Sequence, residues 1–422
     1  MEAFALVVFV AVYLVMIFVS KYRTWAALAG AVLFLVSGLV PIRDFFTTVD
    51  FNVIFMMTGM MLLVSYFSYS GMPLRIADEL LDHSKNLMWV TIYLSLFAGI
   101  VSAFIDNVAT VLMVAPVAIA VAKKQKVSPV PMVISIAVSS NLQGAATLVG
   151  DTTSIMLGAY ADMNFAEFFW MNGRLGIFWA VELGALFTVP VMMIIFRKMK
   201  EPVAADEKTH VDDLFPSVML VAVIGALIAA SFLPHRPAMT NGIICMIGAL
   251  VLVFHSIRKT RRFVETKMAV KEIDYQTLIL LASLFIIVAG ISNAGIIDAI
   301  AAWFVRVGGD NYFALYSLIV WGSVAISAFI DNIPYVSAML PVITGIAGMM
   351  GIEPYLLYFG LLSGATLGGN LTPIGASANI AAVGMLRRHG YEVPSKTFMK
   401  ISVPFTLVAV TAAYIFLWFV WA

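Results

Sequence analysis

The amino-acid sequence predicts an all-α, polytopic membrane protein built as an inverted-topology repeat, with about ten transmembrane helices, two re-entrant hairpins and two interrupted helices. Three observations lead to this prediction. First, 62% of the residues are hydrophobic and only 12% are charged, so a folded chain could not cover its surface with polar groups. Second, apolar runs long enough to cross ~30 Å of hydrocarbon recur along the chain. Third, the hexapeptide SAFIDN occurs at 102–107 and again at 327–332.

Ten segments are predicted to span the bilayer, five in each half of the chain. Those of the first half are residues 3–19, 25–40, 51–70, 130–165 and 174–196. Those of the second half are residues 214–233, 238–256, 274–293, 352–386 and 401–421. The fourth segment of each half is interrupted by Gly- and Thr-rich sequence, where the helix is expected to break. The first segment follows no basic residue and carries no small-residue cleavage site, so we interpret it as a retained helix.

A polar stretch at 198–213 divides the chain into a first repeat, 1–197, and a second repeat, 214–422. A cytoplasmic location for this linker would place 21 of the 25 Lys and Arg residues on the cytoplasmic side, as the positive-inside rule favours. Four basic residues would then face outward: Arg43, Arg174, Arg236 and Arg306. This orientation requires the two SAFIDN segments, 87–122 and 311–347, to turn back within the membrane from opposite sides.

The two halves match each other at a fixed offset of 225 residues around the SAFIDN segments. Nine of sixteen positions are identical between 102–117 and 327–342. The same offset aligns the interruption at 142–155 with that at 367–380. Because each half carries an odd number of spanning segments, the second repeat is predicted to be inverted relative to the first. Inverted repeats with broken helices are typical of secondary transporters, whose sites lie near the midplane at the repeat interface.

The candidate binding residues lie at the hairpin tips and the interruptions. Backbone that leaves a helix at membrane depth must be buried in protein or line a polar cavity, and intramembrane carboxylates are costly enough to indicate function. The candidates of the first half are Asp106, Asn107, Asn141, Thr147, Gly150, Asp151, Thr152, Thr153 and Ser154. Those of the second half are Asp331, Asn332, Asn370, Thr372, Gly375, Ser377 and Asn379.

These residues offer carboxylate, amide and hydroxyl oxygens, which suit a hard cation. We therefore expect a Na⁺ site at Asp106, Asn107, Asp331 and Asn332. A carboxylate could instead carry a proton, and helix N-termini facing the cavity would suit an anion.

The other acidic residues have simpler interpretations. Asp50 and Asp274 each open a predicted helix, where the helix dipole favours a carboxylate. Asp151 is different, because its repeat mate is Ala376 and it therefore breaks the symmetry, which favours membership of the site. Glu182, in the middle of a predicted helix, fits a site role and an interhelix hydrogen bond equally well.

Several segments together resemble the ion transporter superfamily. They are DFNVIFMMTGMMLLV (50–64), SAFIDNVATVLMVAPV (102–117), NLQGAATLVGD (141–151), SAFIDNIPYVSAMLPV (327–342), GGNLTPIGASANI (368–380) and HGYEVP (389–394). The sequence is most similar to the branch of arsenite permeases, NhaD-type sodium/proton antiporters and the melanosomal P protein. It is more distantly similar to the sodium/dicarboxylate symporters.

The resemblance implies a homodimer in a bacterial-type inner (plasma) membrane, with an elevator motion of a transport domain against a scaffold domain. NhaD-type antiporters use residues that correspond here to Asp106, Asn107, Asn141 and Asp151, but Thr153 and Ser154 stand where the antiporters have two threonines. Arsenite permeases tend to have Asn-Asp in the hairpin, and dicarboxylate symporters have Ser-Asn-Thr. The Asp-Asn pairs therefore favour cation or proton coupling, while an arsenite or antimonite permease and a small-anion, dicarboxylate-like transporter stay open.

Three functional classes follow from these observations. The first is a secondary transporter that exchanges Na⁺ for H⁺, working in the lipid bilayer on a small ion without a cofactor. The sequence contains no G-x-x-x-x-G-K-[ST] motif for ATP binding, so an ion gradient would supply the energy. The second is an intramembrane aspartyl protease, which the sequence Leu148-Val149-Gly150-Asp151 does not match and the internal duplication does not explain. The third is a channel. A net charge of +1 and the single cysteine, Cys245, disfavour nucleic-acid binding, disulfides and thiolate metal clusters.

Overall fold

The computed structural model describes residues 1–203, 209–211, 213–233, 237–260, 264–309 and 311–422. Linker residues 204–208 and 212, and the basic residues Lys208, Arg236, Arg261 and Arg262 that entered the orientation argument, lie outside the described residues. The described chain is mostly helical, and it also contains an antiparallel pair of short strands, β1 (Trp170–Met171) and β2 (Arg174–Leu175).

Twenty α-helices follow one another along the described chain. Those of the first half are α1 (Glu2–Phe18), α2 (Arg23–Val36), α3 (Phe45–Thr48), α4 (Phe51–Tyr69), α5 (Met72–Asp82), α6 (Leu87–Ser102), α7 (Asn107–Lys124), α8 (Val130–Gly144), α9 (Thr152–Tyr160) and α10 (Ile177–Phe196). Those of the second half are α11 (Phe215–Ser231), α12 (Thr240–Thr260), α13 (Val264–Lys271), α14 (Tyr275–Asn293), α15 (Ile296–Gly308), α16 (Tyr312–Ser327), α17 (Asn332–Met350), α18 (Tyr355–Gly368), α19 (Ser377–Arg388) and α20 (Ser395–Trp421). Short 3₁₀ turns are η1 (Ser20–Tyr22), η2 (Ile42–Asp44), η3 (Ala166–Phe168) and η4 (Gly369–Leu371).

The predicted segments correspond to helices throughout the described residues. Seven helices are long and apolar enough to cross a membrane: α4, α7, α10, α12, α14, α17 and α20. Five more are apolar but shorter: α1, α2, α6, α11 and α16. Each SAFIDN segment forms the turn of a helical hairpin, α6–α7 or α16–α17, and each predicted interruption separates two helices, α8–α9 or α18–α19. The short helices α3, α5, α13 and α15 were not predicted.

Equivalent residues of the two halves begin and end helices in the same way. Asp50 and Asp274 each accept a hydrogen bond from the backbone amide three residues on, at 3.1 and 3.0 Å, and so cap α4 and α14. Gly71 and Gly295 follow these helices with left-handed φ values of +76° and +75°, a conformation that glycine adopts without steric cost. The internal duplication of the sequence is therefore accompanied by a duplication of local structure.

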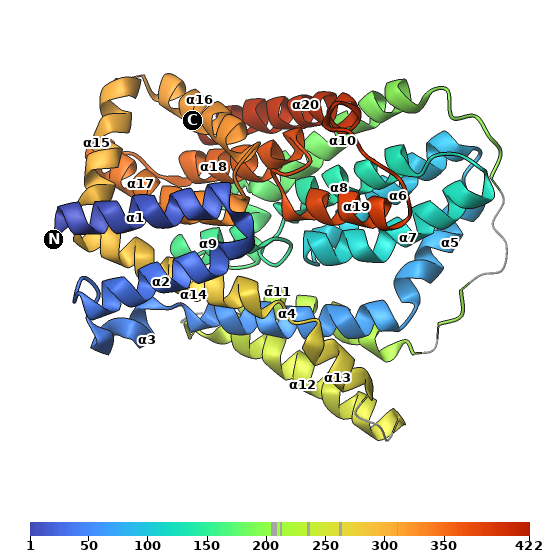
Figure 1. The fold of residues 1–422 in the computed structure, drawn as a ribbon, viewed down its shortest axis with the longest axis horizontal. Helices are drawn as coiled ribbons and strands as arrows, with labels where there is room; N and C mark the ends of the chain where they lie inside the picture. Colours follow the sequence, from blue (N-terminus) through green and yellow to red (C-terminus); the bar gives the residue numbers. More distant parts are fainter. Residues whose placement is uncertain (204–208, 212, 234–236, 261–263, 310) are drawn as a thin grey trace.

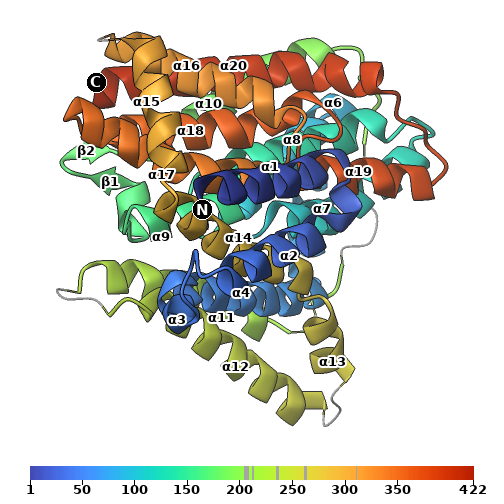
Figure 2. The same ribbon diagram turned by 60° about the vertical axis from the view of Figure 1, so that its left-hand side comes forward.

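Helices of one half pack against helices of the other. α4 packs on α12 and its counterpart α14 packs on α2, while α10 and α20 pack on each other. Within each half, the first hairpin arm packs on the broken helix, α6 on α8 and α16 on α18. Figures 1 and 2 show α4, α11, α12 and α13 on one side of the molecule. The hairpins, the broken helices, α10 and α20 lie on the other side, with α1, α2 and α14 between them.

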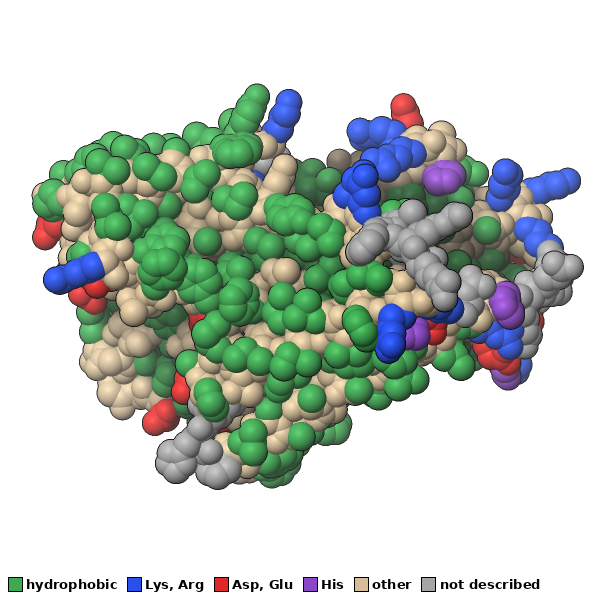
Figure 3. All heavy atoms as spheres, turned by 90° about the horizontal axis from the view of Figure 1, so that it is seen from below, with side chains coloured by type: hydrophobic (Ala, Val, Ile, Leu, Met, Phe, Trp, Pro, Cys, Tyr) green, Lys and Arg blue, Asp and Glu red, His purple; other side chains and the backbone are tan. Residues whose placement is uncertain are grey.

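The outer surface is largely apolar. Large side chains such as Phe18, Ile194 and Phe419 are exposed, and Figure 3 shows hydrophobic side chains over much of one face. Most Lys and Arg side chains of that face gather toward one end of the molecule. The last turns of α7, α12 and α19 each contain two basic residues. The apolar belt fits a lipid environment, because such a surface is unfavourable in water.

Candidate functional site

Each hairpin tip places an aspartate at the start of a long helix. Asp106 accepts hydrogen bonds from the amides of Val108 and Ala109, at 3.0 and 3.1 Å, and caps α7. Asp331 accepts one from the amide of Ile333 at 3.2 Å and caps α17. Aspartate is a favoured N-cap residue, and the positive end of the helix dipole stabilises its negative charge. The SAFIDN sequence thus ends one helix, turns, and holds a carboxylate at the start of the next.

Each interruption packs tightly on the hairpin tip of its own half. Thr147 and Thr372 donate hydrogen bonds to the alanine carbonyl of the neighbouring SAFIDN segment. A Cβ atom at Gly150 or at Gly375 would lie 2.7 Å from that alanine carbonyl and from the preceding serine carbonyl. Only glycine fits such a close backbone approach. These four residues therefore fix where the hairpin aspartates lie relative to the broken helices.

A buried network of amides joins the two halves at the breaks. Asn107 donates to the Asn141 side-chain oxygen at 2.9 Å. Asn141 in turn donates to the Thr366 carbonyl at 2.7 Å and to the Asn370 side-chain oxygen at 3.2 Å. Asn370 completes the chain with a 2.8 Å hydrogen bond to the Val138 carbonyl. Side-chain amides and backbone carbonyls of both halves thus meet in the last turns of α8 and α18.

Asp151 lies at the start of α9, beside this network. Its carboxylate accepts a 2.7 Å hydrogen bond from Thr153, whose hydroxyl is also 3.2 Å from that of Thr366 in the other half. Ser154 instead donates to a backbone carbonyl of its own interruption at 3.4 Å, and Asn379 does the same at 3.1 Å. Ser154 and Asn379 therefore stabilise the two breaks, while the Asp151 carboxylate has the Thr153 hydroxyl as its partner.

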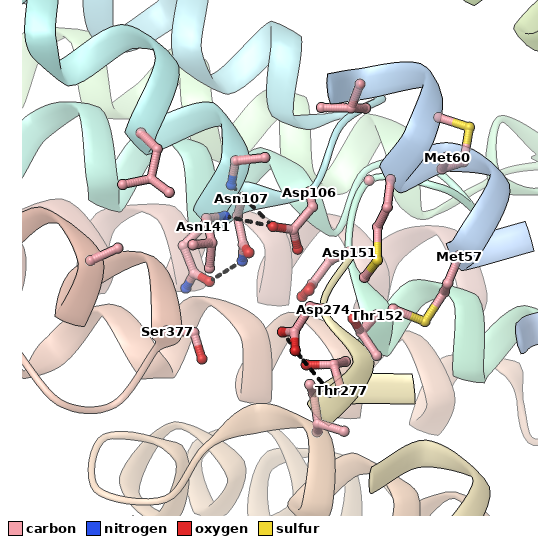
Figure 4. Close-up of a pocket in the computed structure, with 18 of the residues that line it drawn as sticks. Met57, Met60, Asp106, Asn107, Asn141, Asp151, Thr152, Asp274, Thr277 and Ser377 are labelled. Carbon is pink, nitrogen blue, oxygen red and sulfur yellow. Dashed lines mark hydrogen bonds between the residues drawn. The ribbon is translucent and has the colours of Figure 1, made fainter. Parts of the chain in front are cut away.

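A cavity of about 660 Å³ opens between α4 and α7. Five acidic residues line it: Asp106, Asp151, Glu272, Asp274 and Asp331. Figure 4 shows Asp106, Asp151 and Asp274 directed toward the same space, with Met57 and Met60 of α4 across from them. Such a concentration of carboxylates attracts cations and protons because charges in a cleft with low-dielectric walls are poorly screened.

Arg23 of α2 is the one basic residue among the described residues that line this cavity. Its Nη1 donates to Asp331 Oδ2 at 2.6 Å, and Ser377 donates to the same oxygen at 3.0 Å. Asp331 is therefore partnered by a charge and a hydroxyl. Asp106, its repeat mate, takes part in none of the ion pairs among the described residues.

The sequence candidates divide into two groups. Nine line the cavity: Asp106, Asn107, Asn141, Gly150, Asp151, Thr152, Asp331, Asn332 and Ser377. Seven lie beside the hairpin tips and breaks without appearing in its wall: Thr147, Thr153, Ser154, Asn370, Thr372, Gly375 and Asn379. Glu182, for which both roles stayed open, is not in the wall. Among the described residues, no three His, Cys, Asp or Glu side chains are close enough together to hold a metal ion.

Sequence reasoning missed three charged residues of the wall, Arg23, Glu272 and Asp274. Arg23 was counted only among the basic residues of one membrane side, and Asp274 was interpreted as a helix cap. Asp274 is indeed a cap, yet it also lines the cavity. The charge of each residue was visible in the sequence, but the packing of α2 and α14 next to the hairpin tips was not.

A second cavity of about 420 Å³ lies at the first turns of α4, where Asp50, Asn52 and Asp162 line it. Later turns of α4 line the acidic cavity. Ile155 of α9, which is buried, lines both cavities. Ile155 is therefore shared by the walls of the two cavities.

Comparison with known proteins gives relatives along nearly the whole chain. The model of a family described as citrate transporter (CitMHS) matches residues 11–364. An uncharacterized transporter of Mycobacterium tuberculosis (strain ATCC 25618 / H37Rv) is 30% identical, over 99% of this chain and 98% of the relative. The P protein of Mus musculus is 26% identical, over 98% of this chain and 60% of the relative.

Two solved transporters share the fold. The YdaH transporter of Alcanivorax borkumensis is 14% identical, with a TM-score of 0.59 over 92% of this chain and 88% of that one. MtrF of Neisseria gonorrhoeae is 12% identical, with a TM-score of 0.59 over 92% of this chain and 83% of that one. At this identity the likeness concerns the fold alone.

Proposed function

The chain belongs to the citrate transporter family of the ion transporter superfamily, and we propose that it exchanges Na⁺ for H⁺ through the acidic cavity by alternating access. Membership confirms the resemblance found in the sequence. The chain is accordingly an integral, multi-pass membrane protein and a secondary transporter, and the relatives it matches are named transporters. Its coupling ion, its substrate and its mechanism are the proposal.

The observation that carries the proposal is the convergence of Asp106, Asp151 and Asp274 on one cavity (Figure 4). Asp106 has no cationic partner among the described residues, and Asn107 and Asn141, which carry amide oxygens, line the same cavity. Oxygen ligands of this kind suit a hard cation, and the same carboxylates can take up protons instead. Competition of Na⁺ and H⁺ for one set of groups is sufficient to couple their opposite movements.

A difference between the halves supports alternating access. The acidic cavity separates α4 from α7, whereas their counterparts α14 and α17 pack on each other. If the halves are inverted repeats, exchanging these two packings would close this cavity and open one on the opposite side. The side of the molecule that carries the hairpins, broken helices, α10 and α20 would then move as the transport domain. The elevator motion, the homodimer and the cytoplasmic linker rest on the resemblance and on the charge bias.

Purified protein in proteoliposomes that contain a pH-sensitive dye would test the proposal. Na⁺, Li⁺, K⁺, arsenite and citrate would be added in turn to wild type, Asp106→Asn and Asp151→Asn. Asp298→Asn, on an exposed position of α15, is the matched control. We expect Na⁺ or Li⁺ to trigger proton movement in wild type and control but not in the two cavity variants. Unchanged exchange in both cavity variants would refute the site.

A second candidate function is transport of a small carboxylate anion such as citrate, coupled to the same cations. Arg23 favours it, because a guanidinium in the wall gives an anion a partner inside an otherwise acidic cavity. The family description is consistent with it. In the same liposomes, uptake of radiolabelled citrate that needs an inward Na⁺ or H⁺ gradient would establish this function. Its absence at saturating citrate would exclude it.

A further inference from the structure

We propose that Arg23 binds the carboxylate of a transported anion. When no anion is bound, Asp331 forms an ion pair with Arg23 instead. This inference rests on the second candidate function and names the residue that would set its specificity. Its basis is the Arg23–Asp331 ion pair, both members of which line the cavity.

The Arg23–Asp331 pair is built for exchange rather than for permanent stability. The structure has one hydrogen bond between them, from Nη1 to Oδ2, although a guanidinium carries five N–H donors and can bind a carboxylate through two of them. The side chains of Arg23 and Asp331 are 25% and 18% exposed, and both line the cavity. A carboxylate that enters the cavity can therefore reach the guanidinium.

Asp331 keeps partners after Arg23 leaves it. Ser377 donates to its Oδ2 at 3.0 Å, and the amide of Ile333 donates to its other oxygen at 3.2 Å. Removing one member of a buried pair is costly mainly when the other is left without partners. Here the hydroxyl of Ser377 and the helix N-terminus remain, so the Asp331 carboxylate keeps hydrogen-bond donors after the exchange.

The exchange also links the anion to a cation. While Arg23 is paired with Asp331, the two side chains are neutral together. When an incoming carboxylate binds Arg23, Asp331 regains an uncompensated negative charge beside Asp106, Asp151 and Asp274 in the same wall. Uptake of one proton or one Na⁺ by this group restores the balance. Anion binding and cation binding thus favour each other, as linkage requires of coupled sites.

The test measures binding of radiolabelled citrate and of succinate to purified protein in detergent, at fixed Na⁺ and pH. Arg23→Gln removes the proposed partner, and we expect the Kd to rise about 10- to 100-fold, as for the loss of a charged hydrogen bond. Asp331→Asn removes the internal competitor. If the pair is formed about nine-tenths of the time, its loss lowers the Kd about tenfold. Lys21→Gln, two residues from Arg23 and exposed outside the cavity, should change neither value.

The opposite changes expected in the Kd of the two variants distinguish this proposal from a structural salt bridge. If Arg23→Gln and Asp331→Asn weaken citrate binding alike, the pair merely supports the site and the proposal is wrong. Arg23→Lys, which keeps the charge without the planar fork, should bind with intermediate affinity and guards against a folding defect of Arg23→Gln. Wild type that exchanges Na⁺ for H⁺ but binds neither citrate nor succinate would overturn this inference alone. Citrate binding with the expected signs, without Na⁺/H⁺ exchange, would support it and reject the antiport.

Discussion

Alanine at Gly150 would test whether the break between α8 and α9 really closes on the first hairpin tip. A Cβ there would lie 2.6 Å from the Gly144 carbonyl oxygen and 2.7 Å from those of Ala103 and Ser102. Gly375 has the same surroundings in the second half, at 2.6, 2.7 and 2.7 Å. The backbone at Gly150 is not in the left-handed region, so the effect of the substitution is steric.

The size of the effect follows from which atoms collide. All three neighbours of the new methyl group are backbone oxygens, and each lies closer than real Cβ atoms approach such atoms. No side chain can rotate away, so the hairpin tip and the broken helix must separate. Overpacking of a core costs about 1–3 kcal/mol, and we expect a value at the upper end, because rigid backbone must move. Such a shift would also move Asp106 relative to Asp151.

Thermal unfolding in detergent, followed by flux in proteoliposomes, would measure both consequences. Gly384→Ala in α19 is the matched control, since nothing lies within 4 Å of its new Cβ and alanine is the better helix former by about 1 kcal/mol. Gly150→Ala and Gly375→Ala should unfold at lower temperature and transport little, while Gly384→Ala should be unchanged or more stable. If Gly150→Ala matched Gly384→Ala in both assays, the close approach described here would be refuted.

Three further variants probe the network and the linker. Asn141→Ala leaves buried amide groups without partners, so thermal unfolding should report a loss of about 1–3 kcal/mol; no loss would mean that water replaces the network. Thr153→Val removes the hydroxyl that donates to Asp151. It should change the apparent KM for Na⁺ in the flux assay about 2- to 10-fold, and an unchanged KM would place Na⁺ elsewhere. Asp213, at the end of the linker, has a pKa below its usual value. Burial raises this pKa, but hydrogen bonds from the first amide of α11 and from two basic side chains of α12 lower the pKa of Asp213 by more. Its stabilisation is therefore present at pH 7 and is lost as the pH falls below ~4. Asp213→Asn should lower stability by at most about 1 kcal/mol at pH 7 and by less at pH 3, and an equal difference at both pH values would contradict this.

Local sequence signals predicted most of the architecture. Apolar runs located the long helices, and the two SAFIDN copies located the hairpin turns, because an aspartate followed by an apolar run is a helix start. The Gly- and Thr-rich stretches located both breaks. The amphipathic helices α5 and α15 were not predicted; each is separated by two residues from the long apolar helix before it and begins directly after Gly71 or Gly295.

The candidate site was predicted less completely, for a reason of topology. Nine of the sixteen candidates line the cavity, and the others hold its walls. The sequence could not indicate that α14 packs on both α2 and α17. It therefore could not indicate that Arg23 pairs with Asp331, which is 308 residues later in the chain. A repeat match finds residues that the halves share. It does not identify a residue such as Arg23, because the residues that match Arg23 at the offsets of 224 and 225, Ile247 and Gly248, carry no charge.

This asymmetry of charge is what a duplicated site needs in order to couple two ions. Two identical half-sites would bind the same species with the same affinity and would impose no order on binding. Here Asp331 is neutralised by Arg23, whereas Asp106 shares its cavity with Asp151, which has Ala376 as its repeat mate. One half-site therefore presents net negative charge to the cavity, and the other presents the ion pair that we propose an incoming anion separates. The two halves share equivalent hairpins and helix breaks, and Arg23 and Asp151, which the repeats do not share, make the two half-sites chemically different.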